Sequence, residues 1–424
     1  MARKMKDSGI EWIGEIPEGW EIKYFVQLFS QVKNKNIGLR EKNLLSLSYG
    51  KIKQKSIETV GGLLPDNFEG YNIIDCNDIV LRLTDLQNDQ HSLRVGLSHE
   101  RGIITSAYCS IRVRGTESPN YLYYYLHTFD IAKGFYGMGS GVRQGLNWDG
   151  LKYIKILLPP QHEQDRISVF LNQKTLEIDS MLSKTISSIE EYKKFKQAVI
   201  TQAVTKGVRG EREMKDSGVE WIGAIPKEWV CEKIKYATSI SRGLFNHRPR
   251  NDERYYNGKY PFIQTGDVAN ATKYIVSYSQ TLNELGKSVS KEFPKGTLTM
   301  TIAANVGDVA ILNFDAYFPD SVVGFIPNKN IRTLYLFYVF SAMKDEFTRT
   351  AIKSTQLNLN IDRVKETFIP VTHDSNEQCE IENYLESKCA EIDGLIAKKE
   401  QLVKELESYK KSLIYEVVTG KREV

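Results

Sequence analysis

Two long segments, residues 163–205 and 377–419, place apolar side chains at alternating steps of four and three. Glycine and proline are almost absent from both, with Gly394 as the exception. A stripe of this period over more than four heptads is typical of a long helix with a coiled-coil seam. The predicted seam comprises Leu171, Ile178, Leu182, Ile189, Tyr192 and Val199, then Leu385, Ile392, Ile396, Val403, Leu406 and Leu413.

The residues around these segments support the same prediction. Pro159, Pro160 and Pro370 lie just ahead of the two segments, where a helix start tolerates proline. Gly207 and Gly420 follow their ends, where glycine favours a helix C-cap. The simpler alternative is two unrelated amphipathic surface helices, each packed on its own domain. A single stripe over so many residues argues against it, because surface helices are usually much shorter.

The chain is an internal duplication. Residues 5–14 read MKDSGIEWIG, and residues 214–223 read MKDSGVEWIG. Similarity continues through later segments in the same order and includes the polar residues that interrupt the seam, Thr185 with Lys399 and Lys196 with Lys410. Residues 30–110 and 240–325, in contrast, share only a loose strand pattern. One scaffold that carries two different middles indicates two related tasks on two different targets.

Each half divides into a globular segment and a helix. Short β-rich runs such as residues 79–83 and 297–302 predict strands, and the Tyr-rich runs 121–126 and 335–340 predict buried helices, with strand as the alternative. The expected fold class is therefore α+β. We expect two similar globular domains at 1–160 and 209–373, with helices at 161–208 and 374–424.

The order of the parts constrains their arrangement. Because the termini of a domain usually lie close together, the second helix should start near the end of the first and run back beside it. The sequence therefore predicts two long antiparallel coiled-coil helices that join two globular domains with pseudo-two-fold symmetry.

Composition narrows the function classes only slightly. The 424 residues carry a net charge of +4, which is compatible with DNA binding but does not require it. Five scattered cysteines without a C-x-x-C pair favour reduced thiols and a cytoplasmic location. We find no signal peptide, no apolar run long enough to span a membrane and no metal-ligand spacing among the six histidines.

Catalytic motifs are also missing. The chain contains neither a phosphate-binding G-x-x-x-x-G-K-[ST] loop nor a G-x-S-x-G nucleophile elbow. It also lacks the [DNS]-P-P-[FYW] motif of amino-methyl transfer. We therefore expect no catalytic residues, no bound metal and no enzymatic activity in this chain.

Basic and amide side chains in the variable middles and nearby polar loops are the best candidates for a binding surface. Lysine and arginine neutralise phosphates, and arginine, asparagine and glutamine can read base edges. A solvated surface and ordinary turn chemistry remain as alternatives at each position. The DNA-binding candidates are Lys33, Lys35, Arg82, Thr84, Arg143, Gln144 and Asn147 in the first half, and Arg242, Arg248, Arg250, Thr265, Thr355, Gln356 and Asn358 in the second.

One family combines these features. The motif W-I-G-x-I-P-x-x-W opens each half, between Trp12 and Trp20 and between Trp221 and Trp229, and an E-Q pair precedes each long helical stripe. With the duplication, this pattern resembles the specificity subunit of type I restriction-modification systems over essentially the whole chain. The second half departs slightly, because residues 371–376 form a longer spacer before its E-Q pair.

The resemblance implies that each globular domain is a target recognition domain for one half of a bipartite, asymmetric DNA sequence. It implies that the coiled coil sets the unread gap and docks two methyltransferase subunits, with two restriction-translocase subunits joining them. S-adenosylmethionine, ATP and Mg²⁺ would be used by those partners and not bound by this chain.

Two other functions remain open. One is the recognition module of a fused methyltransferase-nuclease, separated from its catalytic domain. The other is a non-catalytic, two-headed scaffold that binds proteins, which predicts no salt-dependent affinity for DNA.

Overall fold

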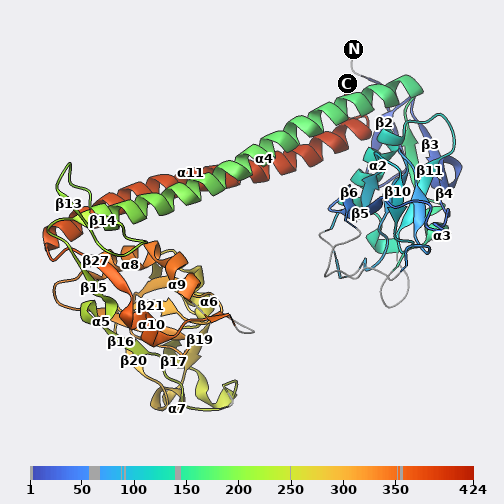
Figure 1. Ribbon diagram of the computed structural model, residues 1–424. Coiled ribbons are helices and arrows are strands. Elements are labelled where there is room, and N and C mark those ends of the chain that lie inside the picture. Colours follow the sequence, from blue (N-terminus) through green and yellow to red (C-terminus); the bar gives the residue numbers. More distant parts are fainter. Residues whose placement is uncertain are drawn as a thin grey trace. The chain divides into compact units, whose positions relative to one another are not determined.

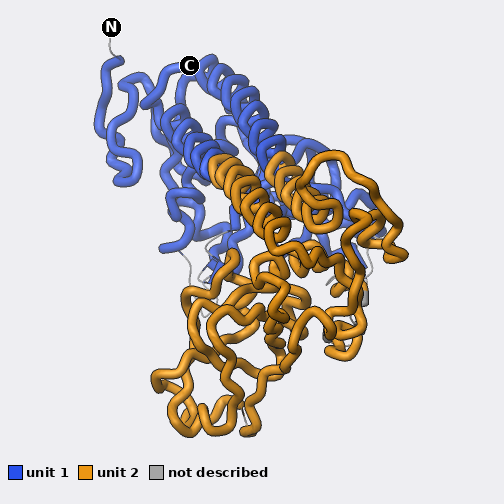
Figure 2. The backbone as a smooth tube through the Cα atoms, turned by 90° about the vertical axis from the view of Figure 1, so that its left-hand side faces the viewer, with its two compact units in different colours: residues 1–186, 401–424 blue, residues 187–400 orange. Residues whose placement is uncertain are grey.

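The computed structural model describes residues 3–56, 67–86, 88–89, 92–138, 145–248, 250–350, 352–353 and 357–424. The chain forms two compact units, coloured separately in Figure 2. Unit 1 contains Met1–Ile186 and Gln401–Val424, and unit 2 contains Ser187–Glu400. Each unit therefore holds one globular segment and one part of each long helix. Helices and strands occur in both units, as expected for a mixed α/β protein.

The long helices are α4, Gln161–Lys206, and α11, Ser375–Val418 (Figure 1). Their bounds lie within two residues of the stripes in the sequence. Gly207 directly follows α4, and Gly420 is the second residue after α11. Both have a φ of 73°, the left-handed conformation that favours glycine at a helix C-cap. The predicted helices and their glycine stops are therefore confirmed.

In unit 1, the globular segment contacts the start of α4 and the end of α11. The Ser118 backbone N–H donates to Gln164 Oε1 (2.9 Å), and the Tyr121 hydroxyl donates to the carbonyl of Val418 (3.3 Å). Within this unit the two helix segments consequently run antiparallel. In unit 2 the roles of the helices are exchanged: the globular segment contacts α11 near its start, at Gln378, and α4 near its end, at Gln197.

Unit 1 contains two four-stranded sheets, β6-β5-β10-β7 and β4-β11-β8-β9, and two strand pairs, β1-β2 and β3-β12. The strands are β1 Met5–Asp7, β2 Glu15–Pro17, β3 Glu21–Tyr24, β4 Phe29–Gln31, β5 Leu44–Ser48, β6 Lys51–Lys55, β7 Asn72–Ile74, β8 Ile79–Leu81, β9 Val95–Leu97, β10 Gly102–Ile104, β11 Cys109–Val113 and β12 Lys155–Leu158. The shorter helices are α1 Phe25–Leu28, α2 Pro119–Ile131, η1 Tyr136–Met138 and α3 Trp148–Leu151.

Unit 2 contains the sheets β16-β24-β21-β22-β18 and β19-β17-β23-β20 and the pairs β13-β14, β15-β27 and β25-β26. The strands are β13 Met214–Asp216, β14 Ala224–Pro226, β15 Val230–Lys233, β16 Thr238–Arg242, β17 Tyr256–Phe262, β18 Tyr274–Ile275, β19 Gln280–Leu282, β20 Glu292–Phe293, β21 Leu298–Thr301, β22 Val309–Leu312, β23 Ala316–Tyr317, β24 Val322–Pro327, β25 Ile352–Lys353, β26 Leu357–Asn358 and β27 Phe368–Val371. Its shorter helices are α5 Ile234–Ala237, η2 Glu253–Tyr255, α6 Thr265–Asn270, α7 Glu284–Ser288, α8 Thr333–Ala342, α9 Lys344–Thr350 and α10 Ile361–Glu366.

The variable middles share more structure than their sequences indicate. In unit 1, β5 pairs antiparallel with β6 and parallel with β10, which pairs antiparallel with β7. In unit 2, β17 pairs antiparallel with β19 and parallel with β23, which pairs antiparallel with β20. Backbone hydrogen bonds make these ladders, so side chains can diverge while the topology persists.

The Tyr-rich segments form the buried helices α2 and α8, as predicted. Tyr121 and Tyr335 are fully buried, and each hydroxyl reaches a backbone carbonyl of the strand before a long helix, at Leu157 and Pro370. These hydrogen bonds explain why tyrosine can occupy a core position in both halves.

Candidate nucleic-acid interface and helix junctions

The second tryptophan of the repeated motif anchors the start of a long helix. In unit 1, Trp20 is 1% exposed, and its Nε1–H donates to Glu163 Oε2 of α4 at 2.6 Å. Arg3 forms an ion pair with the other oxygen of Glu163 and lies over the Trp20 ring, 5.7 Å from its centre. The motif and the distant E-Q pair thus form one junction.

Unit 2 repeats this junction with deeper burial. Trp229 donates to Glu377 Oε2 at 2.9 Å, and Arg212 pairs with Glu377 Oε1 at 2.6 Å. The Glu377 side chain is 1% exposed, against 13% for Glu163. A buried carboxylate needs such partners, because an unpaired charge there would be costly. Glu377 is therefore the more buried of the two acids and depends more on its partners.

The glutamine of each E-Q pair holds the buried helix of its globular segment. Gln164 accepts from the Ser118 N–H at the start of α2 and donates to the carbonyl of Pro159 (2.9 Å each). Gln378 accepts from the Arg332 N–H at the start of α8 (2.8 Å) and donates to the carbonyl of Thr372 (2.7 Å). A side-chain amide that both donates and accepts is suited to this position.

An aspartate–lysine pair accompanies the predicted helix seam in both units. In unit 1, Lys410 donates to Asp179 Oδ1 at 2.5 Å, and in unit 2, Lys196 donates to Asp393 Oδ2 at 2.6 Å. Burial raises the pKa of Asp179, but hydrogen bonds from Lys410 and Lys51 outweigh it and leave that pKa below its usual value. None of the twelve predicted seam residues is exposed, and Leu171, Ile178, Ile189, Leu385, Ile392 and Leu413 are buried.

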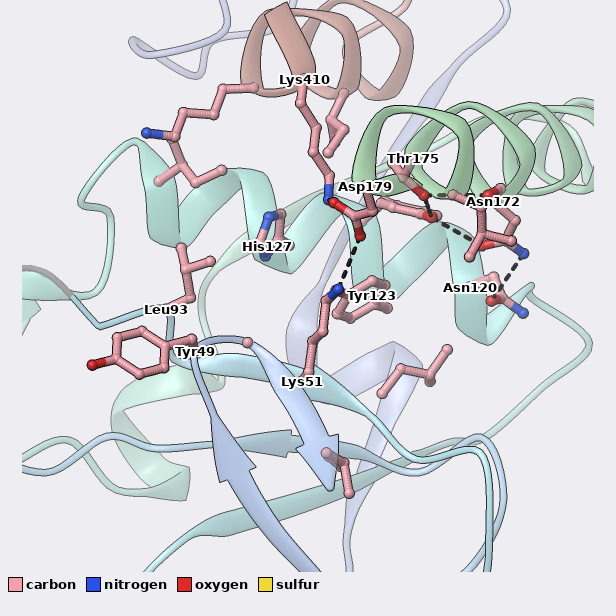
Figure 3. Close-up of a pocket in the computed structure, with 18 of the residues that line it drawn as sticks. Tyr49, Lys51, Leu93, Asn120, Tyr123, His127, Asn172, Thr175, Asp179 and Lys410 are labelled. Atoms are coloured by element: carbon pink, nitrogen blue, oxygen red, sulfur yellow. Dashed lines mark hydrogen bonds and ion pairs between the residues drawn. The ribbon is translucent and has the colours of Figure 1, made fainter. Parts of the chain in front are cut away.

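A cavity of about 800 Å³ lies in unit 1 between α2, the β5–β6 hairpin and the two helix segments (Figure 3). Lys51 of β6 reaches across it to Asp179 (2.9 Å), and His127 of α2 points into it. Burial, with the charges of Lys410 and Lys411, lowers the pKa of His127 to about 4, so its ring is neutral at pH 7. Among the described residues, none forms a hydrogen bond with His127 Nδ1.

Unit 2 has a cavity of about 480 Å³ at matching positions of the repeat. Tyr338 and Ser341 of α8 line it where Tyr124 and His127 line the first. Here the variable middle contributes Lys273, which forms an ion pair with Glu386. The Tyr338 hydroxyl donates to the same carboxylate. Burial raises the pKa of Glu386, but hydrogen bonds from Lys273 and Tyr338 leave it below its usual value.

Several DNA-binding candidates of the first half lie close to one another. The Leu146 N–H donates to the carbonyl of Leu83 at 2.9 Å, which brings Asn147 beside the segment that carries Arg82 and Thr84. The strand predicted at 79–83 ends at Leu81, so Arg82 and Thr84 both lie after the strand. Arg82 pairs with Asp89 (3.3 Å), Thr84 is exposed, and Asn147 caps α3 by accepting from Gly150 N–H (3.1 Å).

The two lysines are also exposed. Lys33 follows β4, and its charge contributes, after that of Lys152, to the lowered pKa of Asp149 beside Asn147. Lys35 donates to the carbonyl of Gly70 at 2.7 Å. Lys33 therefore lies near the Arg82–Asn147 group, while Lys35 belongs to the neighbouring bridge with Asn72.

Sequence reasoning missed Arg94, which is fully buried. Its guanidinium donates to the carbonyls of Arg82 (3.1 Å), Thr84 (2.8 Å) and Asp85 (3.2 Å). Arg94 therefore fixes the segment that presents two of the candidates. No local signal distinguishes it, because a single arginine between apolar residues gives no indication of which backbone carbonyls its side chain will contact.

In unit 2, three candidate arginines converge on one acid. Arg242 Nε donates to the carbonyl of Asp320 at 2.5 Å, while Arg248 and Arg250 pair with its two carboxylate oxygens. Thr265 is the first residue of α6 and is half-buried. Arg143, Gln144, Thr355 and Gln356 lie outside the described residues, as does the side chain of Asn358, whose backbone is in β26.

The described residues offer neither a metal site nor a membrane-spanning helix. Across the described ranges, no group of three or more His, Cys, Asp or Glu side chains could hold a metal ion. Likewise, no helix in the described part of the chain is long and apolar enough to cross a membrane.

Comparisons with known proteins point to one family. The family model described as "type I restriction modification DNA specificity domain" matches residues 240–405. Two relatives from Methanocaldococcus jannaschii align along the chain. The putative type I restriction enzyme MjaX specificity subunit is 24% identical and the MjaVIII specificity subunit 23%. Each alignment covers 96% of this chain and, respectively, 95% and 93% of the relative.

Solved structures share the fold. A chain from a study of complex assembly and conformational transition in the type I restriction-modification system matches with a TM-score of 0.73 and 15% identity, over 96% of this chain and 99% of that one. The HsdS subunit from Thermoanaerobacter tengcongensis matches with a TM-score of 0.52 and 14% identity, over 96% and 98%. The chain is therefore similar to type I restriction enzyme specificity subunits along almost its whole length.

Proposed function

We propose that this chain is the DNA sequence-specificity subunit of a type I restriction-modification complex. The observation that carries the proposal is the repeated scaffold: both halves have the same Trp–Glu–Arg junction and the same Asp–Lys pair, but different middles. A protein that presents two different surfaces on one repeated frame is suited to read two different half-sites. Relatives named specificity subunits, of nearly the same length, support this function.

Each globular segment would read one half of a bipartite, asymmetric target. In the first, Arg82, Thr84 and Asn147 would contact bases or phosphates, since they lie together and Arg94 holds their segment. In the second, Arg242, Arg248 and Arg250 would do so. Arginine can form paired hydrogen bonds with guanine, and lysines such as Lys33 would contribute phosphate contacts.

The helix pair would act as a ruler between the half-sites. We propose that α4 and α11 form a continuous antiparallel coiled coil with the two domains at its ends, related by a pseudo-two-fold axis. The domains would be 1–160 and 209–373, with the helical regions at 161–208 and 374–424. Equal numbers of residues separate Asp179 from Lys196 and Asp393 from Lys410, as the two ion pairs of such an arrangement require.

The chain would act without a cofactor of its own. Two methyltransferase subunits would dock on the helix pair and supply adenine methylation from S-adenosylmethionine. Two restriction-translocase subunits would supply ATP- and Mg²⁺-dependent translocation and cleavage. A repeated frame favours two copies of each partner, because equivalent surfaces bind equivalent subunits. Such a complex would act on chromosomal DNA in the cytoplasm.

The decisive experiment is to map adenine methylation in DNA from cells that co-express the chain with its methyltransferase subunit. A two-part motif with a fixed gap is expected, and exchange of one globular segment should change only one half of it. If an assembled, active complex leaves no methylated motif, the alternative of a two-headed protein-binding scaffold is favoured instead.

The ruler has its own test. We would delete one heptad between Asp179 and Lys196 and a second between Asp393 and Lys410, which keeps both ion pairs in register. Seven helical residues span about 10 Å, so the gap should shorten by about three base pairs. Deletion of only one of the two heptads is the control and should disrupt the pairing. An unchanged gap in the matched deletion would contradict the ruler.

A further inference from the structure

The arginine group of unit 2 is organised by Asp320, which lies between β23 and β24. Arg250 Nη2 pairs with Asp320 Oδ1, Arg248 Nη2 lies 3.6 Å from Oδ2, and Arg242 Nε donates to the backbone carbonyl at 2.5 Å. The side chains of Arg248 and Arg250 are 55% and 44% exposed. Two arginines therefore pair with the Asp320 carboxylate, a third binds the Asp320 backbone, and all three remain accessible to a further anion.

The backbone allows the segment of Arg242 to come close to the segment of Asp320. Gly243 follows Arg242, and a Cβ at this glycine would lie 2.2 Å from the carbonyl oxygen of Pro319 and 2.4 Å from that of Phe318. Only glycine permits so close a contact between backbones. The segment that carries Arg242 is consequently packed directly against the segment that carries Asp320.

A buried aromatic group supports the other arginines. Phe245 is 4% exposed and stacks on Tyr256, with ring centres 5.7 Å apart. The Tyr256 hydroxyl donates to the carbonyl of Arg250, and Arg248 donates to the carbonyl of Phe245 at 2.7 Å. The arginines thus extend from a fixed platform, which lowers the entropy lost when a ligand binds them.

An arginine–acid group in unit 1 provides a contrast. There Arg112 pairs with Asp78 and Asp75, and Arg101 pairs with Asp75 and Glu41. Three acids serve two arginines, and the Asp78 side chain is 1% exposed. Each arginine of that group is therefore paired with two carboxylates, and the group has a structural role. Around Asp320 the ratio is reversed, which leaves excess positive charge at the surface.

Fold stability does not account for the group around Asp320. Exposed ion pairs contribute little, because water and salt screen them and the side chains lose entropy. Three like charges side by side also repel one another. An exposed cluster of this kind, built on a rigid platform, is suited to bind a multivalent anion such as the DNA backbone.

We propose that Asp320 is a positioning residue that acts as an internal counter-ion for DNA recognition by the second globular segment. This inference rests on the proposed function. In the free protein, the Asp320 carboxylate pre-orients Arg248 and Arg250 and competes with phosphates for them. A correct half-site offers base-edge and phosphate contacts that together displace it, whereas random DNA offers phosphates alone. Asp320 therefore lowers affinity for random DNA and increases discrimination.

The test compares Asp320→Asn with wild type, using the full-length chain assembled with its methyltransferase subunit and a fluorescent duplex of random sequence. D320N should bind this duplex at least about three-fold more tightly at low salt, with a salt dependence steeper by about one phosphate contact. It should also relax the methylated motif only in the half read by unit 2.

Three further variants serve as controls. Asp362→Asn removes an equal charge from an exposed ion pair with Lys365 on the same unit and should behave like wild type. Asp320→Glu keeps the carboxylate and should retain low affinity for random DNA. In a chain that carries R242Q, R248Q and R250Q, the added D320N change should produce no gain.

Each outcome is informative. If D320N binds random DNA like D362N, or more weakly than wild type, the counter-ion role is overturned. A gain that persists without the three arginines also overturns it, because the charge would then act elsewhere. If the wild-type complex itself shows no salt-dependent affinity for DNA and no methylated motif, the proposed function fails, which is a distinct result.

Discussion

The cavity beside α2 in unit 1 and the cavity beside α8 in unit 2 use matching positions of the repeat but differ in charge and polarity. Both retain the Asp–Lys pair of the helix segments, Asp179–Lys410 and Lys196–Asp393. His127 in the first corresponds to Ser341 in the second, as Figure 3 allows the reader to follow for the first cavity. The helical frame is thus preserved while the residues that face the middles have changed.

Each variable middle also contributes one lysine that crosses its cavity to an acid on a long helix. Lys51 of the first middle reaches Asp179, which already pairs with Lys410, and its side chain is 62% exposed. Lys273 of the second middle reaches a separate acid, Glu386, and is 24% exposed. Each variable middle therefore has its own contact with the repeated helices. The comparison teaches that divergent middles need individually adapted contacts with a common frame.

The largest expected effect comes from removing a junction tryptophan. Trp20→Ala should cost unit 1 about 3–5 kcal/mol of stability, because it removes a fully buried ring and leaves Glu163 with one partner fewer. Trp229→Ala should do the same in unit 2. Hydrogen exchange, followed separately in peptides of each unit, measures this effect. Tyr153→Ala, at an aromatic that is 77% exposed, is the control. Equal loss of protection in both units would contradict independent junctions.

The second effect depends on pH and should occur only in unit 1. The pKa of His127 is lowered from 6.5 to about 4 in the folded protein, chiefly by burial and also by Lys410 and Lys411. The unfolded chain therefore binds the proton first, and stability falls as pH decreases from about 6.5 to about 4. The loss should reach up to about 3 kcal/mol below pH 4.

His127→Ser, which introduces the residue found at the equivalent position of unit 2, should remove this part of the pH dependence. Hydrogen exchange of unit 1 peptides at several pH values measures it, with unit 2 peptides as the internal reference. An unchanged slope between pH 4 and 6.5 in the variant would show that His127 does not cause it.

A smaller difference in stability is expected between variants of the two junction glutamates. Glu377→Gln should cost about 2 kcal/mol, because Arg212, only 14% exposed, then lacks its buried partner. Glu163→Gln should cost less than about 1 kcal/mol, because Arg3 is 29% exposed and can turn to solvent. Urea denaturation followed by exchange in each unit provides the measurement. A larger cost for E163Q would reverse the ranking by burial.

The smallest effects should come from the crossing lysines. Lys273→Met should cost about 1 kcal/mol, because among the described residues it leaves a half-buried Glu386 with the Tyr338 hydroxyl as its remaining partner. Lys51→Met should cost less than about 0.5 kcal/mol, because Asp179 keeps Lys410. Added salt should reduce the second cost more than the first. If both variants lose equal stability, the two contacts are equivalent after all.

Sequence patterns predicted the frame of the molecule well. The heptad stripes predicted α4 and α11 to within two residues, and the Tyr-rich runs predicted α2 and α8. The W-I-G-x-I-P-x-x-W and E-Q motifs indicated the same family to which the comparisons point. These features are local or periodic, so a short window of sequence contains the information that specifies them.

The candidate site was only partly predictable. Arg242, Arg248 and Arg250 form a recognisable cluster in the sequence, but Asp320, their common partner, is far away along the chain. Arg94 likewise gives no signal, although it fixes the segment of Arg82 and Thr84. The shared topology of the two middles was also hidden, because strand pairing depends on backbone contacts between distant segments.

By itself, the sequence determined that the chain is a duplication, that each half ends in a long helix and which family it resembles. Tertiary structure alone decided that Glu163 and Glu377 hold the tryptophans of the repeated motif, and that one acid, Asp320, faces three arginines. The reason is physical. Helical periodicity is written in neighbouring residues, whereas ion pairs and buried hydrogen bonds arise only when folding brings distant residues together.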